Sequence, residues 1–431
     1  MRLLALLLRS GWLLPLALTV VAAGCGDDAG SPGGDDDDDD MSMVGDDDDD
    51  TGNPAGGAQL GDGSPDSMVL TTIWSSPTPR EATDLDFDPQ TGQLWATLRE
   101  YFDSNLSCTQ ANRAPDLRNP GCAQLWGSTV AITDPGGDEP VGEWMQDTNA
   151  WHFMRRPSAI AFGIPDQRSA ATPEVSTWFA TCHEWNTGNF DDDPTDFIGP
   201  THWTSDPVVY PDWAVTSDPE ANGSHLDMLH ASPFCVGIAH ERDAIYWVFN
   251  GNVGSIDMYD FADPHPDRTI GGADHSDGTI YRYAQGEFMW EPNVMSHVDF
   301  GPEARWLYIA DSGNGRVARL DITSGTEGAR FAPAYDQLRI SNFVDGAVVE
   351  TVVPPGTLDT PSGLDVADGE LFVTDNATSI IYAFSLEGEL LNQFDTGLPT
   401  DSLGGLVVGP DDKVYLVNRL TADIYRLDPA N

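Results

Sequence analysis

Short apolar segments recur at regular intervals along the chain from residue 82 onward. Each unit contains a strand that opens on a small or polar residue, a turn with Asp, Gly or Pro, and a second apolar strand that ends in polar residues. This spacing, with glycine-rich turns and almost no helical period, is typical of an all-β fold built by radial repetition. Six copies align: 82–95, 157–162 with 177–182, 234–238 with 245–250, 296–300 with 307–311, 361–366 with 371–375, and 404–408 with 414–418.

A third strand follows several copies, for example at 316–320, 380–384 and 424–427. Each unit therefore has the content of a propeller blade, and six units predict a six-bladed β-propeller over residues 67–431. The last copy lacks a fourth strand, whereas the apolar segment 68–74 precedes the first copy. We predict that this N-terminal strand forms the outer edge of the last blade and closes the ring.

One segment has a family resemblance. Residues 307–317, Leu-Tyr-Ile-Ala-Asp-Ser-Gly-Asn-Gly-Arg-Val, resemble an NHL repeat, and 375–382 is a looser copy. The resemblance covers residues 295–429 and implies an NHL-like six-bladed propeller. Because NHL-type propellers include binding modules, a peptidyl-hydroxyglycine lyase and, more distantly, gluconolactonase-like hydrolases, the resemblance leaves the function open.

The first 24 residues have the features of a signal peptide. Arg2 and Arg9 precede an apolar run that ends in small residues. The segment Ala22-Ala-Gly-Cys25 resembles the bacterial lipobox, which implies that Cys25 is lipidated and becomes the mature N-terminus. Gly26 follows the cysteine, and by resemblance to lipoprotein sorting this implies an exported protein anchored in the cell envelope, at the outer membrane.

Residues 25–66 predict a disordered tether behind the lipidated cysteine. They are rich in Gly, Ser, Pro and Asp, with unbroken aspartate runs at 35–40 and 46–50. Such a composition cannot form a core, and like charges extend it. Flexible carboxylates bind calcium weakly, so we favour a solvated spacer over a calcium-binding segment.

The rest of the chain is acidic as well. The formal charge is −50, and residues 1–66 hold fifteen Asp and two Arg, which leaves −37 on residues 67–431. Such a surface disfavours nucleic acid and anionic membranes as partners, and favours cations or basic partners.

Four cysteines follow Cys25, namely Cys108, Cys122, Cys182 and Cys235. In an exported protein an even number predicts two disulfides, with three pairings open. The blade register places Cys182 and Cys235 in adjacent blades on one face. This leaves Cys108 with Cys122, in a loop of the first blade.

The same register predicts a ring of side chains around the mouth of the central channel, where first strands begin and second strands end. The ring residues are Asp84, Arg99, His183, Asn250, His297, Asp311, Asp375, Asn418 and Arg419. This face also receives the largest insertion, 184–230, which is rich in aromatic residues. These aromatic residues can form a ligand-binding surface or a small apolar core of the insertion itself. We favour the core, because large insertions need apolar burial to stay ordered.

One loop combines imidazole and carboxylate groups, as a divalent-cation site would. Its residues are Asp263, His265, Asp274, His275 and Asp277. Turn material also has this composition, so calcium or zinc is a candidate cofactor without further support. We expect the ring histidines His183 and His297 not to ligate zinc, because neighbouring ring positions offer Cys, Gly and Asn.

These features favour a lipid-anchored extracytoplasmic propeller that binds a ligand or an envelope protein through its insertion-bearing face. The alternative is a metal-dependent hydrolase or lyase, lactonase-like or hydroxyglycine-lyase-like, that acts in the central channel and needs three convergent ligands. The chain has no Gly-x-Ser-x-Gly, His-Glu-x-x-His, phosphate-loop or Cys-x-x-Cys motif. Whether the protein is an enzyme stays open at this stage.

The lipobox resemblance leads to a direct prediction. Replacing Cys25 with Ser removes the lipidated thiol and should release the protein from membranes into the soluble extracytoplasmic fraction. Fractionation followed by immunoblotting measures this, with the unmodified chain as control. A Cys25→Ser variant that still sediments with lipid after washing without detergent would show that Cys25 is not the anchor.

Overall fold

The computed structural model describes residues 56–64, 66–101, 126–147, 150, 154–163, 177–185, 198–207, 209–211, 224–263, 276–332 and 336–430. Several sequence predictions fall outside these residues: the signal peptide, Cys25, most of the tether, Cys108, Cys122, His265, Asp274 and His275. No helix within the described residues is long and apolar enough to cross a lipid bilayer.

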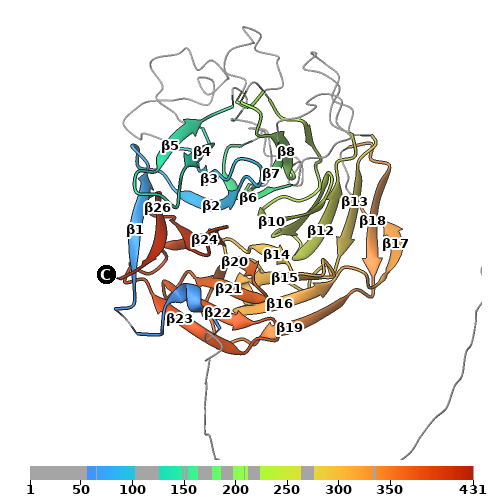
Figure 1. The fold of residues 1–431 in the computed structure, drawn as a ribbon. Helices are drawn as coiled ribbons and strands as arrows, with labels where there is room; N and C mark the ends of the chain where they lie inside the picture. Colours follow the sequence, from blue (N-terminus) through green and yellow to red (C-terminus); the bar gives the residue numbers. More distant parts are fainter. Residues whose placement is uncertain are drawn as a thin grey trace, which may run out of the picture. The chain divides into compact units, whose positions relative to one another are not determined.

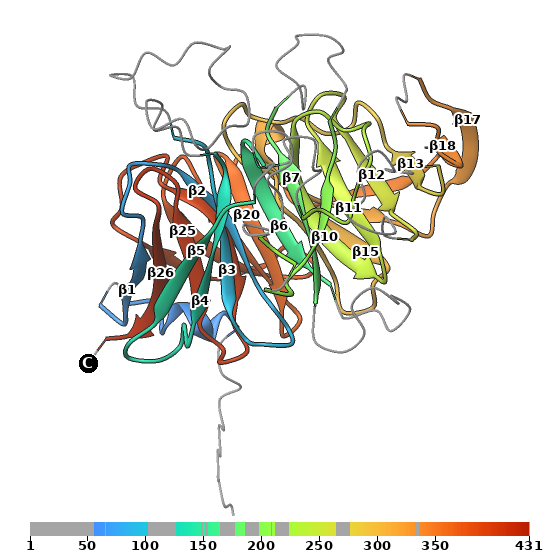
Figure 2. The ribbon, with the colours of Figure 1, turned by 90° about the horizontal axis from the view of Figure 1, so that it is seen from above.

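The fold is a six-bladed β-propeller, as predicted (Figures 1 and 2). Blade 1 contains β2 (Ala82–Phe87), β3 (Leu94–Leu98), β4 (Ser128–Thr133) and β5 (Val141–Met145). Blade 2 contains β6 (Pro157–Phe162), β7 (Trp178–His183), β8 (Thr201–Thr204) and β9 (Asp227–Met228). Blade 3 contains β10 (Cys235–Arg242), β11 (Ile245–Asn250), β12 (Ser255–Asp260) and β13 (Thr279–Tyr283).

The second half of the chain forms the other three blades. Blade 4 contains β14 (Val298–Phe300), β15 (Trp306–Asp311), β16 (Arg316–Asp321) and β19 (Val348–Val353), with the short 3-10 helix η3 (Ser312–Asn314) between β15 and β16. Blade 5 contains β20 (Pro361–Ala367), β21 (Glu370–Asp375), β22 (Ile380–Ser385) and β23 (Leu390–Asp395). Blade 6 contains β24 (Leu403–Val408), β25 (Val414–Asn418), β26 (Asp423–Pro429) and the N-terminal β1 (Met68–Ser75).

Blade 6 closes the ring in the predicted way. β1 pairs antiparallel with β26, from Met68 opposite Pro429 to Ser75 opposite Asp423. The two ends of the propeller thus share one sheet, which leaves no open gap between the first and last blades.

Six apolar clusters hold the blades together, one between each pair of neighbours. One position of the first strand recurs in every cluster and is 1% exposed in all six blades. It is occupied by Leu85, Ile160, Ile238, Val298, Leu364 and Leu406. Because alternate residues of a strand point to opposite faces, this periodicity explains why the sequence pattern revealed the blades.

The segment 184–230 is not one insertion, which corrects the sequence interpretation. It contains β8 and β9, the third and fourth strands of blade 2. These strands are short and polar, and therefore lack the apolar alternation that marks a strand. The aromatics Trp203 and Tyr210 are fully buried between blades 1 and 2, whereas Phe190, Phe197 and Trp213 lie outside the described residues.

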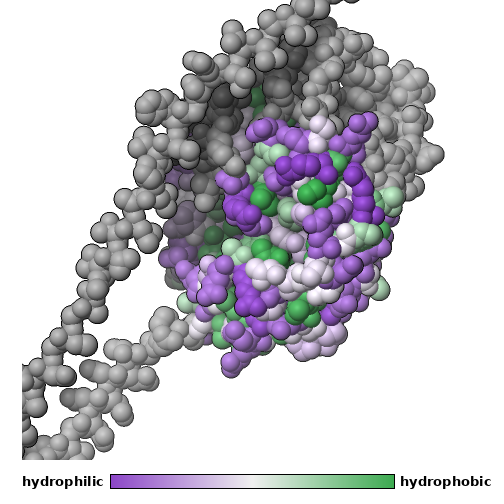
Figure 3. Space-filling model, turned by 90° about the vertical axis from the view of Figure 1, so that its right-hand side faces the viewer, coloured by the Kyte–Doolittle hydropathy of each residue, from purple (hydrophilic) through white to green (hydrophobic). Residues whose placement is uncertain are grey.

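A hairpin that the sequence pattern did not reveal extends blade 3. β17 (Thr326–Arg330) and β18 (Ile340–Asp345) leave blade 4 after β16, and β18 pairs in parallel with β13. The sheet of blade 3 thereby gains two strands at the rim (Figures 1 and 2). The described surface on this side is mostly hydrophilic, with scattered apolar residues (Figure 3), as expected for a protected sheet edge.

The last part of the predicted tether is bound to the propeller, which corrects its boundary at residue 66. The 3-10 helix η1 (Ala58–Leu60) places Leu60, 1% exposed, in the cluster between blades 5 and 6. The backbone N–H of Gly57 donates to Oε2 of Glu370 at 2.7 Å, and the side-chain amide of Asn392 donates to the carbonyls of Gly57 and Gly61 at 3.0 and 2.9 Å. One leucine in a polar segment was too weak a signal to predict this latch, residues 56–61.

The latch predicts a measurable contribution to stability. Replacing Leu60 with Ala should lower the free energy of unfolding by about 2–4 kcal/mol, because it leaves a cavity between two blades. Urea titration of the full chain measures this. Leu390→Ala is the matched control, since Leu390 is 49% exposed on β23 and should change stability by less than about 0.5 kcal/mol. Equal effects of the two substitutions would show that the latch does not form.

Candidate functional site

Two faces of the propeller must be distinguished. On the mouth face the first strands begin and the second strands end, as Ala82 opposite Leu98 and Pro157 opposite His183 show. The opposite face carries the turns between first and second strands and is called the turn face. All nine residues of the predicted ring lie in the described part of the chain, and the structure separates them into different environments.

Asp84 and His297 meet in the central channel, although they come from blades 1 and 4 on opposite sides of the ring. Nε2 of His297 lies 2.7 Å from Oδ2 of Asp84, and Nδ1 lies 2.9 Å from the carbonyl oxygen of Leu364 in blade 5. Oδ2 of Asp84 also accepts a hydrogen bond of 2.8 Å from the backbone N–H of Ile160 in blade 2. Asp84 is fully buried and His297 is 7% exposed. The pair therefore closes the channel and links four blades.

Blade 6 provides the space for this arrangement. A Cβ at Gly405 would lie 2.0 Å from Oδ1 of Asp84, so any larger residue would displace the carboxylate. Gly405 lies in β24, the first strand of blade 6, and this close approach explains why a glycine occupies the position.

His297 holds a proton on each ring nitrogen, because both nitrogens face acceptors. Burial by itself lowers the pKa of His297, but the negative charge of Asp84 and the hydrogen bonds to Asp84 and Leu364 together raise it to about 9. The imidazolium has no lone pair to offer a metal ion. This arrangement suits a structural ion pair better than a zinc ligand.

Three carboxyl groups line a cavity of about 230 Å³ on the turn-face side of this pair. Asp86, Asp299 and Asp365 each accept a hydrogen bond of 2.6–2.8 Å from a backbone N–H of the first strand of the following blade. Burial raises the pKa of Asp86 to about 7, and it raises the pKa values of Asp299 and Asp365, which also act on each other. Burial thus disfavours the charged form of all three carboxyl groups, so the cavity is less negative than three ionised aspartates would make it.

Four ring residues at the ends of second strands do not converge on the channel, which corrects the prediction. Asn250, Asp311, Asp375 and Asn418 accept hydrogen bonds of 2.8–3.1 Å from backbone N–H groups of adjacent loops. The reason is that these loops have N–H groups that need acceptors: the turn after the second strand supplies the donors for Asn250 and Asn418, and the loop before the first strand supplies them for Asp311 and Asp375. Their side chains organise loops and form no shared ligand set.

The structure joins Cys182 and Cys235 in a disulfide between β7 and β10, with Cα atoms 5.0 Å apart. The pairing predicted from the blade register is confirmed. His183, the next residue, is fully buried, and its Nε2 lies 3.5 Å from Oγ1 of Thr201 in β8. His183 therefore has a partner within blade 2, whereas His297 has its partner across the channel.

The predicted cation loop is only partly described. The backbone N–H of Asp263 donates to Oδ2 of Asp277 at 3.1 Å, so the two ends of the loop meet. Across the described ranges of the chain, no three His, Cys, Asp or Glu side chains are arranged to hold a metal ion. The calcium or zinc site stays a prediction.

Guanidinium groups gather on the mouth face where blades 6, 1 and 2 meet. Only 20 of the 431 residues are Lys or Arg, so their concentration here is informative. We call this set the arginine group: Arg80, Arg99, Arg155, Arg156 and Arg419. Two of them, Arg99 and Arg419, belong to the predicted ring.

Glutamates connect the members of this group. Nη1 of Arg99 lies 2.7 Å from Oε2 of Glu81, and Nη2 of Arg419 lies 3.6 Å from the same oxygen. Glu184 contacts Arg99 and also lies 3.8 Å from Nη2 of Arg156.

Within the described part of the chain, the ion pairs of this group involve three carboxylates. Arg155 lies 2.9 Å from Glu100, while Glu81 and Glu184 contact Arg99, Arg156 and Arg419. The group thus concentrates five guanidinium groups in one place on an otherwise acidic domain.

Arg99 is the buried centre of the arginine group. It is 3% exposed, and its Nε has no hydrogen-bond partner among the described residues. Burial, opposed by the attraction of Glu81 and assisted by the charges of Arg156 and Arg419, lowers the pKa of Arg99 to about 9. Arg80 donates to the carbonyl of Arg99 at 3.0 Å, and burial lowers its pKa to about 10. A negative charge placed nearby would raise these pKa values and stabilise the charged guanidinium groups.

Sequence reasoning missed Arg155, Arg156 and their glutamate partners. Consecutive arginines directly before the predicted strand 157–162 were the available signal in a chain with so few basic residues. The repeat alignment concealed them, because it compares strand positions and ignores the loop residues between blades.

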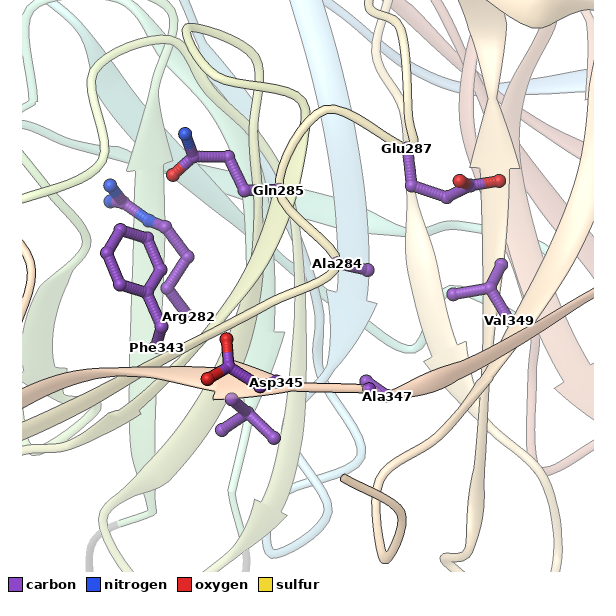
Figure 4. Close-up of a pocket in the computed structure, with 10 residues that line it drawn as sticks. Arg282, Ala284, Gln285, Glu287, Phe343, Asp345, Ala347 and Val349 are labelled. Carbon is purple, nitrogen blue, oxygen red and sulfur yellow. The ribbon is translucent and has the colours of Figure 1, made fainter. Parts of the chain in front are cut away.

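A larger cavity, of about 430 Å³, lies between the hairpin β17–β18 and blade 4 (Figure 4). Arg282, Asp345 and Glu287 are among its lining residues. Nη2 of Arg282 already contacts Oδ2 of Asp257 at 2.8 Å, and its guanidinium stacks on Phe331 at 4.3 Å. The guanidinium group of Arg282 therefore stabilises the packing within blade 3, and we consider the mouth face the stronger candidate site.

Comparison with known proteins bears on the fold only. No protein-family model and no curated protein matches the sequence. An auxiliary nutrient-binding protein from Bacteroides thetaiotaomicron is similar in structure, with 10% identity, 85% of this chain and 76% of that chain covered, and a TM-score of 0.47. The soluble aldose sugar dehydrogenase of Escherichia coli, in its apo form, has 11% identity, 84% and 100% coverage, and a TM-score of 0.47. A virginiamycin B lyase from Staphylococcus aureus has 10% identity, 84% and 99% coverage, and a TM-score of 0.40. Such distant similarity says nothing about ligand or activity.

The buried ion pair predicts a pH dependence of stability. The pKa of His297 is raised in the folded protein to about 9, so its contribution is fully present below the unfolded value of about 6.5 and is lost as pH rises through 9. Urea titration should show a loss of about 2–3 kcal/mol between pH 6.5 and 9.5.

The variant His297→Gln is the control for this prediction. It cannot bind the proton, so its stability should be lower at pH 6.5 and should change less between the two pH values. If the unmodified protein and the variant lose equal stability over this range, the ion pair is not formed.

Proposed function

We propose that this chain is an extracytoplasmic binding protein that takes up a small anionic ligand at its mouth face, through the arginine group. The observation that carries the proposal is the concentration of guanidinium groups around the buried Arg99 in a domain whose formal charge is −37. Guanidinium groups bind carboxylates and phosphates through paired, charge-assisted hydrogen bonds.

The accessible part of the arginine group determines how a ligand can approach. The side chains of Arg156 and Arg419 are 26% and 12% exposed, whereas that of Arg99 is 4% exposed. Arg156 and Arg419 therefore supply the direct contacts, and Arg99 supplies a fixed charge beneath them. A ligand bound beside Arg156 and Arg419 is partly shielded from water, so its electrostatic attraction to the guanidinium groups is stronger than in bulk water.

His297 is not available as a general base in the channel. Two histidines line the channel cavity, His240 and His297, and both ring nitrogens of His297 are engaged by Asp84 and Leu364. A general base needs a free ring nitrogen within reach of a substrate proton. His297 therefore lends no support to the hydrolase or lyase alternative.

The location of the protein rests on two further arguments. A disulfide such as Cys182–Cys235 persists in oxidising compartments outside the cytoplasm. The lipobox resemblance at Cys25 adds a lipid anchor to the proposal. The latch lies beside Glu370, which follows a turn of the turn face, so the latch and the proposed ligand lie on opposite faces of the propeller.

The proposal predicts selective binding of acids. Calorimetric titration of the detergent-solubilised full chain with small carboxylates and phosphate esters should give binding that weakens with salt, while neutral analogues of the same size should not bind. The double variant Arg156→Gln with Arg419→Gln should lower the affinity by at least about tenfold, because it removes charge-assisted hydrogen bonds.

Arg319→Gln is the matched control, since Arg319 pairs with Glu350 at 2.9 Å on the outer part of blade 4. It should leave the affinity unchanged. Binding of neutral or cationic compounds in place of acids would refute the proposed function.

A further inference from the structure

An arc of aromatic side chains continues the arginine group across the mouth face. The guanidinium carbons of Arg155 and Arg156 lie 4.5 and 5.5 Å from the ring centre of Trp185. The carbonyl of Trp185 accepts a hydrogen bond of 2.8 Å from the backbone N–H of Phe234. The rings of Phe234 and Trp290 stack with centroids 5.1 Å apart. We call Trp185, Phe234 and Trp290 the aromatic arc.

The arc lies at the edge of the apolar core, because Trp185 packs against the cluster between blades 1 and 2 and Trp290 against the cluster between blades 3 and 4. Its three members are half-buried, whereas aromatic residues of the clusters between blades, such as Trp203 and Phe249, are fully buried. Met289, beside Trp290 in the chain, is 55% exposed. Large rings that remain accessible next to a charged group offer a surface for stacking.

Phe234 adopts a backbone conformation that a bulky residue rarely takes. Its φ is +52°, in the left-handed region that favours glycine. Hydrogen bonds of 2.8 Å hold it on both sides, from its N–H to Trp185 and from the N–H of Gly251 to its carbonyl. The next residue is Cys235 of the disulfide. Unfavourable backbone conformations of this kind cluster at active sites and ligand-binding sites.

Gly251 permits the close packing of the arc. A Cβ at this position would lie 2.8 Å from the carbonyl oxygen of Phe234 and 3.1 Å from the ring of Trp290. Phe234, Gly251 and Trp290 are thus held together as one ordered surface.

We infer that the ligand is a small acid with a ring, whose ring face stacks on the aromatic arc while its acid group contacts Arg156 and Arg419. This inference rests on the proposed function and narrows the ligand class. The shared chemistry is a ring with an apolar face next to a carboxylate, which aromatic acids and uronic acids both offer. A polyanion such as nucleic acid does not fit, because the remaining surface is strongly acidic.

The first test uses the unmodified full chain and needs no variant. The probes are 4-hydroxybenzoate and galacturonate as ring acids, succinate as a ringless acid, and 4-hydroxybenzyl alcohol and galactose as neutral rings. At least one ring acid should bind about three- to tenfold more tightly than succinate, and neutral rings should not bind. The ring acid that binds more tightly shows whether the ligand is an aromatic acid or a uronic acid.

The second test removes one ring of the arc. Trp290→Ala should lower the affinity for the ring acid by about three- to tenfold and leave that for succinate unchanged, whereas Trp290→Phe should restore most of it. Trp306→Ala is the control, because Trp306 lies under Arg305 and Arg319 in blade 4, outside the aromatic arc. Thermal unfolding of each variant verifies the fold.

The outcomes separate the two proposals. Equal affinity for ring acids and succinate, with no effect of Trp290→Ala, overturns this inference and leaves the proposed function standing. Failure of every acid to bind overturns the proposed function and this inference with it. Equal losses for ring acid and succinate in Trp290→Ala would assign the arc a structural role and also overturn the inference.

Discussion

The ion pair between Asp84 and His297 is the interaction on which the arrangement of the blades depends. It spans the axis of the ring, and its hydrogen bonds to Ile160 and Leu364 bring blades 1, 2, 4 and 5 to one point. Because both groups are buried, removing either partner leaves a charge in a place of low polarity, which is strongly unfavourable. The same pair closes the channel, so each face of the propeller has its own chemistry.

The mouth face and the channel cavity consequently differ in chemistry. Guanidinium groups occupy the mouth face, and the buried carboxyl groups of Asp86, Asp299 and Asp365 lie on the far side of the ion pair. An anion attracted to the arginine group would meet the ion pair that spans the channel before it reached these carboxyl groups. The proposed ligand would therefore bind at the mouth face and not in the channel cavity.

The strand pattern predicted the number of blades and the ring closure, because strands buried on both sides must repeat apolar residues at fixed positions. It failed for β8 and β9, whose few polar residues carry no period, and for β17 and β18, whose parallel pairing with β13 depends on distant residues. The site was found only in part. Asp84, His297, Arg99 and Arg419 followed from the register, while Arg155, Arg156 and the aromatic arc lie in loops that obey no repeat. Asn250 and its equivalents were misplaced, since a register gives position along a strand and not the partner of a side chain.

The latch at residues 56–61 has a mechanical consequence. It precedes β1 in the chain and is fixed to Glu370 and Asn392 by hydrogen bonds and to the seam of blades 5 and 6 by Leu60. Any pulling force applied to the chain ahead of residue 56 reaches these contacts before it reaches β1. The latch thus shields the strand that closes the ring from such a force.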